Sequence, residues 1–263
     1  MKLKPDEDVS VQKTRIGRVP TLILRPVNRP STPVSVLWIH GGGYILGMKE
    51  MVYMTRAEDL VKKFGVTVYS PGYRLAWQKP YPAAIDDCYQ VLEYMSKHSD
   101  TLMVGGESAG GGLAIAVCMM ARDRGIKVAF QTPLYPMISN IDTESSRDNH
   151  GKVWNTRRNH LGWRLYLRRD AKKRVSPYAA PAWQTDYSNL PSCYTFVGDG
   201  EPFFCETVEY VKKLKNAGVE AQVDIYHTDV HAFDIFSEKS YSIEAKMKFY
   251  QRFEKALDAC LKV

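Results

Sequence analysis

A serine between two glycines is the sharpest chemical feature of the chain, in the segment Gly106-Glu107-Ser108-Ala109-Gly110. It directly follows the apolar run 101–105, and helix-compatible residues begin at once behind it. This order predicts a serine on a tight turn between a strand and a helix, with its hydroxyl exposed above a sheet. The glycines are required there because a Cβ would collide with neighbouring backbone. The pattern indicates a nucleophile, and a structural glycine-rich turn is the alternative.

A glycine triplet forms a second signal, in the segment His40-Gly41-Gly42-Gly43-Tyr44 behind the apolar run Val34–Ile39. Consecutive glycines leave backbone N–H groups free to face a ligand, which is what an oxyanion hole requires when a carbonyl oxygen becomes negative. A triplet alone is equally typical of a flexible turn. Its position upstream of the Ser108 turn favours the oxyanion hole.

Short apolar runs alternate with helix-period segments along most of the chain, and this order predicts a parallel sheet, because parallel neighbours need a crossover. The first strands follow one another without helices, so we expect an antiparallel edge there. The predicted strands are Val9–Gly17, Thr21–Arg25, Val34–Ile39, Val66–Ser70, Leu102–Gly105, Val128–Gln131, Cys193–Val197 and Ala221–Tyr226. The predicted helices are Val52–Phe64, Ala83–Lys97, Ala109–Arg124, Cys205–Asn216 and Ser240–Leu261.

The overall composition is that of a folded α/β protein. The chain has 263 residues, of which 44% are hydrophobic and 25% charged, so we expect one domain over residues 1–263. No apolar run reaches the roughly 18 residues of a membrane span, and the first residues have no signal-peptide core. The five cysteines are odd in number and form no C-x-x-C pair, which disfavours a disulfide framework and a structural zinc site. We expect a cytoplasmic protein.

The net charge of +7 comes mostly from one stretch, Lys152 to Arg174, in which nine basic residues face the single acid Asp170. A nucleic-acid partner would require a recognised binding module, and the sequence has none. We interpret the stretch as a solvated helical surface. Attraction of anionic substrates or of an acidic partner is the alternative.

The region from Ile138 to Ala182 interrupts the alternation of strands and helices, since it is polar, basic and contains Trp154 and Trp163. A plain crossover between two strands would need far fewer residues. An insertion of this size above a parallel sheet often forms a lid over the crevice at the strand ends. We therefore interpret residues 138–182 as a cap (lid) insertion, and a long decorated crossover is the competing view.

Three segments together resemble one known family. They are HGGGY at 40–44, YRLA at 73–76 with YPAAIDD at 81–87, and GESAGGG at 106–112. In these segments the chain is similar to the hormone-sensitive-lipase-like carboxylesterases of the α/β-hydrolase fold, from about residue 34 to the C-terminus and only weakly over 138–182. The resemblance implies a mostly parallel eight-stranded sheet flanked by helices, a Ser–acid–His triad, and hydrolysis of small carboxylic esters through an acyl-enzyme. It implies no cofactor and no metal.

The resemblance also implies roles for individual residues. Ser108 matches the family's nucleophile. The backbone N–H groups of Gly42, Gly43 and Ala109 match the oxyanion-hole donors, with Gly41 as an alternative donor. These positions are carried over from the motifs alone.

The acid and the base follow from the same resemblance. The family's acid stands before a proline just past the penultimate strand, which matches Glu201, with Asp199 in the same loop as the alternative. The family often has a second acid four residues later, where this chain has Cys205. The base comes last in the chain, and His231, followed by Ala-Phe, matches it better than His227. The other histidines without a motif are expected at the surface: His98, His150 and His160.

The start of the chain suggests the size of the substrate. Strand-like residues begin by about Val9, whereas family members carry cap helices before the first strand. We therefore expect a truncated N-terminal cap and a shallow acyl site, which a second subunit of a homodimer could complete, and short acyl esters, acetate to butyrate, as substrates. The same triad would also serve an arylformamidase or a small amide or peptide hydrolase. A non-catalytic ligand receptor is a further alternative.

Overall fold

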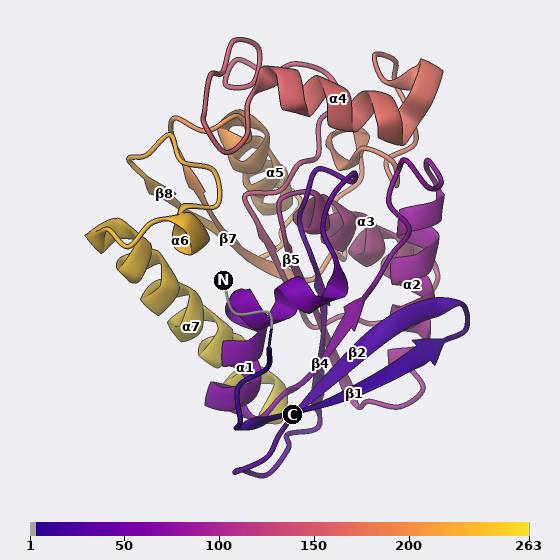
Figure 1. Ribbon diagram of the computed structural model, residues 1–263, viewed down its shortest axis with the longest axis vertical. Helices are drawn as coiled ribbons and strands as arrows, with labels where there is room; N and C mark the ends of the chain where they lie inside the picture. Colours follow the sequence, from indigo (N-terminus) through magenta and orange to yellow (C-terminus); the bar gives the residue numbers. More distant parts are fainter. Residues whose placement is uncertain (1–3, 263) are drawn as a thin grey trace.

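One eight-stranded sheet forms the centre of the molecule (Figure 1). The computed structural model describes residues 4–262. The strand order is β1-β2-β4-β3-β5-β6-β7-β8. The strands are β1 (Val9–Ile16), β2 (Val19–Pro26), β3 (Val34–Ile39), β4 (Thr67–Pro71), β5 (Thr101–Glu107), β6 (Phe130–Leu134), β7 (Ser192–Gly198) and β8 (Ala221–Tyr226). The pairs β1–β2 and β2–β4 are antiparallel and all others are parallel. The expected fold class, including the antiparallel edge, is confirmed.

Helices cover both faces of this sheet (Figure 1). α1 and α7 pack on one face, and α2, α3 and α5 pack on the other. The α-helices are α1 (Arg56–Phe64), α2 (Ala83–Met95), α3 (Ala109–Asp123), α4 (Thr156–Leu167), α5 (Phe204–Asn216), α6 (Phe233–Phe236) and α7 (Ser240–Leu261), and the 3-10 helices are η1 (Lys49–Met54), η2 (Arg168–Asp170) and η3 (Pro181–Trp183). The helix expected over 52–64 is interrupted, because Thr55 is extended and separates η1 from α1.

Strand β3 shows how the sequence builds the two cores. Successive side chains of a strand point to opposite faces. Accordingly Val34, Val36 and Trp38 belong to the core shared with α1 and α7, whereas Leu37 and Ile39 belong to the core shared with α2 and α3. All six residues of β3 are buried, as expected for a strand covered on both sides. The continuous apolar run 34–39 is therefore a central strand.

The parallel strands end at one edge of the sheet, and their following loops meet there. β3 and β5 are direct neighbours, with Ile39 opposite Gly106, so the His40–Tyr44 loop begins beside the Ser108 turn. The loops behind β7 and β8 reach the same edge because both strands run parallel to β5 and β6. Segments that are far apart along the chain thus converge on one place.

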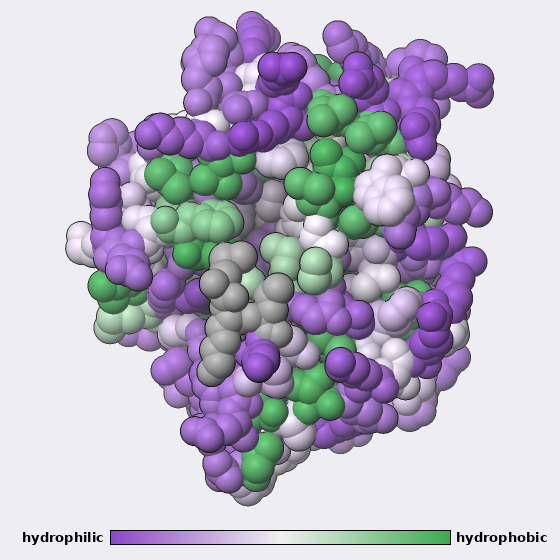
Figure 2. Space-filling model, in the orientation of Figure 1, coloured by the Kyte–Doolittle hydropathy of each residue, from purple (hydrophilic) through white to green (hydrophobic). Residues whose placement is uncertain are grey.

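The insertion 138–182 lies above this edge, with α4 at the top of Figure 1. Asn155 caps α4 by accepting a hydrogen bond from the N–H of Arg158 (3.1 Å). Trp163 and Tyr166 are buried beneath the helix, while Arg157 and Arg164 are exposed above it. Figure 2 shows hydrophilic side chains along this upper edge. Within residues 4–262, no helix combines the length and the hydropathy needed to cross a membrane.

Candidate active site

Ser108 occupies a strained turn between β5 and α3. Its backbone has φ 57° and ψ −120°, a conformation that costs a non-glycine residue on the order of 1–3 kcal/mol. The turn is held by a hydrogen bond from the Ser108 N–H to the Leu134 carbonyl (3.0 Å). A Cβ on Gly106 or Gly110 would come within 2.5 or 2.1 Å of the Ile39 carbonyl oxygen. The two flanking glycines therefore let the turn approach β3, as the sequence pattern predicts.

His231 joins this hydroxyl to a buried carboxylate. Its Nε2 lies 2.9 Å from Ser108 Oγ, and its Nδ1 bonds to Glu201 Oε2. The other oxygen of Glu201 accepts a hydrogen bond from the Gly198 N–H (2.9 Å). All three side chains are buried, Glu201 completely. A hydroxyl, an imidazole and a carboxylate in this order can transfer a proton from the hydroxyl and stabilise the resulting imidazolium.

Aromatic rings fix the orientation of the imidazole. Tyr135 and Phe203 meet His231 edge-on from two sides, each with its ring centroid 5.0 Å from that of the imidazole. Ala232 follows with φ 56°, so the backbone turns sharply just behind the histidine. These contacts leave the imidazole little freedom to rotate away from Ser108.

The alternative acid and base are paired with each other instead. Asp199 Oδ2 lies 2.8 Å from His227 Nδ1, and this hydrogen bond raises the pKa of His227. The His227 side chain is fully exposed, and neither residue bonds to His231 or Ser108 in the described part of the chain. The remaining histidines without a motif are exposed as expected: His98, His150 and His160.

The glycine loop lies directly beside the serine. A Cβ on Gly41 would come within 3.3 Å of Ser108 Cβ. Gly42 and Gly43 have φ angles of 115° and 60°, which L side chains rarely adopt. Among residues 4–262, the N–H groups of Gly42, Gly43 and Ala109 donate to no carbonyl, and Ala109 opens α3, where N–H groups lack helical partners. The same holds for the N–H of Gly41, the alternative donor, so four backbone donors are available around Ser108 among the described residues.

His40 anchors the beginning of this loop. Its ring stacks on Tyr73, with centroids 4.2 Å apart, and its Nδ1 lies 2.8 Å from the Gly41 carbonyl oxygen. Burial lowers the pKa of His40 to about 4, so the ring is neutral at pH 7. The sequence analysis included His40 in the glycine motif but assigned it no function. The stacking of His40 on Tyr73 could not be predicted, because no sequence pattern links the two residues.

The insertion contacts the loops on both sides of Ser108. Trp154 covers the glycine loop so closely that a Cβ on Gly43 would come within 2.1 Å of its ring. On the other side, the Asn149 side chain donates to the Gly200 carbonyl (3.0 Å) and the Ser145 hydroxyl donates to the Pro202 carbonyl (2.9 Å). The insertion thus contacts both the glycine loop and the loop that carries Glu201. Sequence analysis did not predict these contacts.

Glu206, which sequence analysis missed, fastens the start of the insertion to α5. Its Oε1 accepts hydrogen bonds from the N–H groups of Ile138 (2.6 Å) and Ser139 (3.1 Å). Burial raises the pKa of this carboxyl to about 8. At the preceding position, the backbone N–H of Cys205 donates to Ser145 Oγ (3.1 Å). The neighbouring Glu206 carries the buried carboxyl here.

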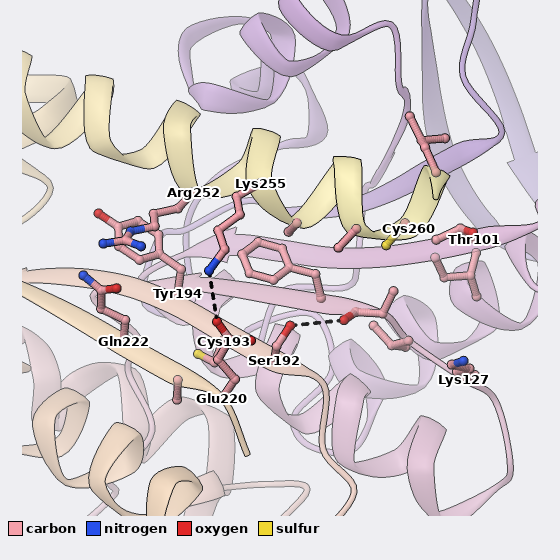
Figure 3. A pocket seen from close by; sticks show the side chains of 18 of the residues that line it. Thr101, Lys127, Ser192, Cys193, Tyr194, Glu220, Gln222, Arg252, Lys255 and Cys260 are labelled. Atoms are coloured by element: carbon pink, nitrogen blue, oxygen red, sulfur yellow. Dashed lines mark hydrogen bonds and ion pairs between the residues drawn. The ribbon is translucent and has the colours of Figure 1, made fainter. Parts of the chain in front are cut away.

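A cavity of about 890 Å³ lies at the opposite end of the sheet (Figure 3). It is lined by the first residues of β5 to β8 and the end of α7, and Lys255 pairs with Glu220 across it (3.5 Å). None of the residues discussed around Ser108 lines it. Among the described residues, no three His, Cys, Asp or Glu side chains gather as ligands for a metal ion.

Comparison with known proteins identifies relatives of this chain. A family model described as "alpha/beta hydrolase fold" matches residues 36–235. An arylesterase of Saccharolobus solfataricus is 28% identical over 230 residues, covering 82% of this chain and 72% of the relative. Two solved structures are similar to this chain. A bacterial heroin esterase has a TM-score of 0.89 and 27% identity, and the match covers 98% of this chain and 86% of the esterase. A hormone-sensitive lipase from a metagenome library has a TM-score of 0.83 and 25% identity, and the match covers 94% of this chain and 86% of the lipase.

Proposed function

Because the chain belongs to the α/β-hydrolase fold family and is a carboxylic ester hydrolase of its hormone-sensitive-lipase-like branch, we propose that Ser108, Glu201 and His231 are its catalytic triad. The single observation that carries the proposal is the continuous hydrogen-bonded series from Ser108 Oγ through the imidazole to the Glu201 carboxylate. His231 accepts the Ser108 proton as the hydroxyl attacks the ester carbonyl. Glu201 holds the imidazole in the tautomer that has Nε2 unprotonated and stabilises its cation.

The oxyanion of the tetrahedral intermediate is then stabilised by the N–H groups of Gly42, Gly43 and Ala109. The proposal is supported by the absence of other acceptors for these groups in the described chain and by the contact of the glycine loop with Ser108. Donors of this kind are typically worth about 3–4 kcal/mol each in the transition state. His231 then gives the proton that it took from Ser108 to the leaving alkoxide, so that collapse of the intermediate releases the alcohol and leaves an acyl-enzyme on Ser108. Water activated by His231 hydrolyses the acyl-enzyme.

Short-chain esters, acetate to butyrate, are the substrates we propose. The support is the crowding of the site, because Trp154 covers the glycine loop and the rings of Tyr135 and Phe203 flank His231. Ser108 itself is only 6% exposed. We also propose that residues 138–182 act as the cap of a single domain, since they contact the loops on both sides of Ser108.

Steady-state kinetics with p-nitrophenyl esters of increasing acyl length test both parts of the proposal. Ser108→Ala should lower kcat by at least about 10³-fold while the protein stays folded. The wild-type rate should be highest between two and four acyl carbons. Undiminished activity of Ser108→Ala would contradict the triad. A maximum at ten carbons or more would contradict the substrate class.

A further inference from the structure

A buried group of charged side chains that the proposed mechanism does not use lies behind the Ser108 turn. Glu107 is the last residue of β5, Arg56 begins α1, and Asp234 stands in α6, three residues after His231. Their exposed fractions are 4%, 6% and 0%. Burying a charge costs several kcal/mol unless it is compensated, so this arrangement calls for a structural or functional reason.

The contacts within this group tie distant segments together. Arg56 Nε lies 3.8 Å from Asp234 Oδ2. The other oxygen of Asp234 accepts a hydrogen bond from the Tyr135 hydroxyl (2.8 Å), and Glu107 Oε1 accepts one from Trp38 Nε1 (2.8 Å). Four buried side-chain atoms here have no hydrogen-bond partner among the described residues: Thr55 Oγ1, Arg56 Nε, Glu107 Oε2 and Asp234 Oδ2.

The Arg56 guanidinium lies within ion-pair distance of Asp234 and acts more weakly on Glu107. Burial, together with the neighbouring Asp234, raises the pKa of Glu107 to about 8, against the opposing effects of the Trp38 hydrogen bond, of Thr55 and of Arg56. Burial likewise raises the pKa of Asp234, against the opposing effect of Arg56. The other charged or titratable groups that act on Asp234 or Arg56 are Lys246, Tyr135, Tyr250 and Asp59. Arg56 is more buried than Lys246, the other cation, and its ion pair is with Asp234 on the His231 side of the Ser108–His231 contact.

The two acids belong to the two segments that must meet for catalysis. Glu107 precedes Ser108 directly, and Asp234 lies in the short helix that closes the His231 loop. Tyr135, which bonds to Asp234, also packs edge-on against His231. A displacement of Asp234 would therefore move the imidazole relative to the serine hydroxyl. Misplacement by about 1 Å can cost on the order of 10²-fold in rate.

We propose that Arg56 is a positioning residue, whose buried charge holds Asp234 next to the end of β5 and thereby keeps His231 within reach of Ser108. Arg56 touches neither Ser108 nor His231 and takes no part in proton transfer. The inference rests on the proposed triad. It predicts that loss of this charge slows acylation and leaves substrate binding unchanged.

Arg56→Met and Arg56→Lys, compared with the surface variant Arg15→Met, test this inference. Folding is checked by circular dichroism, and kcat, KM and the rate of fluorophosphonate labelling are measured. Arg56→Met should lower kcat and labelling at least about tenfold with KM within about twofold, and Arg56→Lys should recover most of the loss. Arg15 is exposed on β1, and among the described residues its side chain bonds only to the nearby Arg18 carbonyl, so Arg15→Met should match wild type.

A folded Arg56→Met with wild-type kcat, or with a change in KM alone, would overturn the inference. If Arg56→Met does not fold, Asp234→Asn is measured in the same way, and wild-type kcat in that variant would overturn it equally. The double variant Arg56→Met with Asp234→Asn should be no slower than the slower single variant, because both remove one interaction. Failure of the triad itself is recognised separately, by activity that survives in Ser108→Ala.

Discussion

At the scale of single residues, the chemistry depends on which of two neighbouring acids serves the imidazole. Glu201 is completely buried and bonds to His231 Nδ1, whereas Asp199 is partly exposed and bonds to His227. The loop sequence alone offers both acids, since they are two residues apart. What separates them is the conformation of the loop, in which Glu201 turns back to accept a hydrogen bond from Gly198.

Glu201→Gln and Asp199→Asn should therefore differ strongly. Glu201→Gln leaves the shape of the site intact but no longer holds the imidazole in the productive tautomer, so kcat should fall by about 10³- to 10⁴-fold. Asp199→Asn should stay within about threefold of wild type, since its partner His227 is at the surface. Comparison of kcat with p-nitrophenyl acetate measures both. The opposite ranking of the two variants would assign the triad acid to Asp199.

Glu206 should make stability depend on pH. Its pKa is raised from 4.5 to about 8 in the folded state, so the folded protein keeps a proton that the unfolded chain loses near its ordinary pKa. Its contribution is complete below about pH 4.5 and is lost as pH rises through about 8. The free energy of unfolding should thus fall by on the order of a few kcal/mol between pH 5 and 8.

Urea titrations of wild type, Glu206→Gln and Glu209→Gln at several pH values measure this effect. Glu209 lies on the same helix and is exposed, so its variant should follow the wild-type curve. Glu206→Gln should make the curve clearly less steep, and the remaining slope belongs to Glu107, whose pKa burial also raises to about 8. An equal fall of stability with pH in all three proteins would show that Glu206 is not the group responsible.

At the scale of elements, the glycine loop and the insertion form one packed unit. The insertion reaches the loop twice, through the Trp154 ring on Gly43 and through Gly162, whose Cβ would come within 2.8 Å of the Gly43 carbonyl oxygen. Tyr44, the next residue, stacks on Tyr166 of α4 with ring centroids 4.1 Å apart. The position of the oxyanion donors is therefore coupled to the packing of α4.

Gly43→Ala should be far more damaging than Gly125→Ala. Both glycines have positive φ, but a Cβ on Gly43 meets the Trp154 ring, whereas a Cβ on Gly125 meets nothing within 4 Å. Gly125→Ala should cost only the backbone strain, about 1 kcal/mol, and leave kcat unchanged. Gly43→Ala should lower kcat at least about 10²-fold through the displaced oxyanion donor. Equal kcat in the two variants would separate the glycine loop from catalysis.

Much of the architecture could be predicted from sequence, because strands such as Val34–Ile39 and helices such as Ala83–Met95 have strong local signals. Motifs also pointed to Ser108, Glu201 and His231 before their proximity was visible. The contact of Trp154 with Gly43 and the Arg56–Asp234 pair could not be predicted, since they join segments more than 100 residues apart through packing alone. The interruption of the predicted helix at Thr55 could not be predicted either, because the surrounding segment has the periodicity of a continuous helix.

At the scale of the whole molecule, the charge is unevenly distributed. The net charge is +7. The nine Lys and Arg residues between Lys152 and Arg174 are all exposed, and they lie on the insertion above Ser108. Of these nine Lys and Arg residues, only Lys173 forms an ion pair within the described part of the chain, with Asp170. The unpaired positive charge should attract anions to the side of the molecule where the substrate enters.

An ester that carries a carboxylate should therefore respond to salt more than a neutral one. Between about 20 and 500 mM salt, kcat/KM for the anionic ester should fall severalfold, while kcat/KM for p-nitrophenyl acetate stays nearly constant. The variant Arg157→Glu with Arg164→Glu, at two exposed positions of α4, should reduce the salt effect. Identical salt dependence for both esters would mean that this surface has no effect on substrate capture.

The central claim is that Ser108 is a nucleophile activated by His231 and Glu201, and its most direct measurement is the mass of the protein after reaction with a fluorophosphonate. Wild type should gain one adduct, located by peptide mapping on Ser108. Ser108→Ala should gain none, and His231→Ala should react at least about 10³-fold more slowly. Labelling of Ser108→Ala at the wild-type rate, or an adduct on another residue in wild type, would contradict the account.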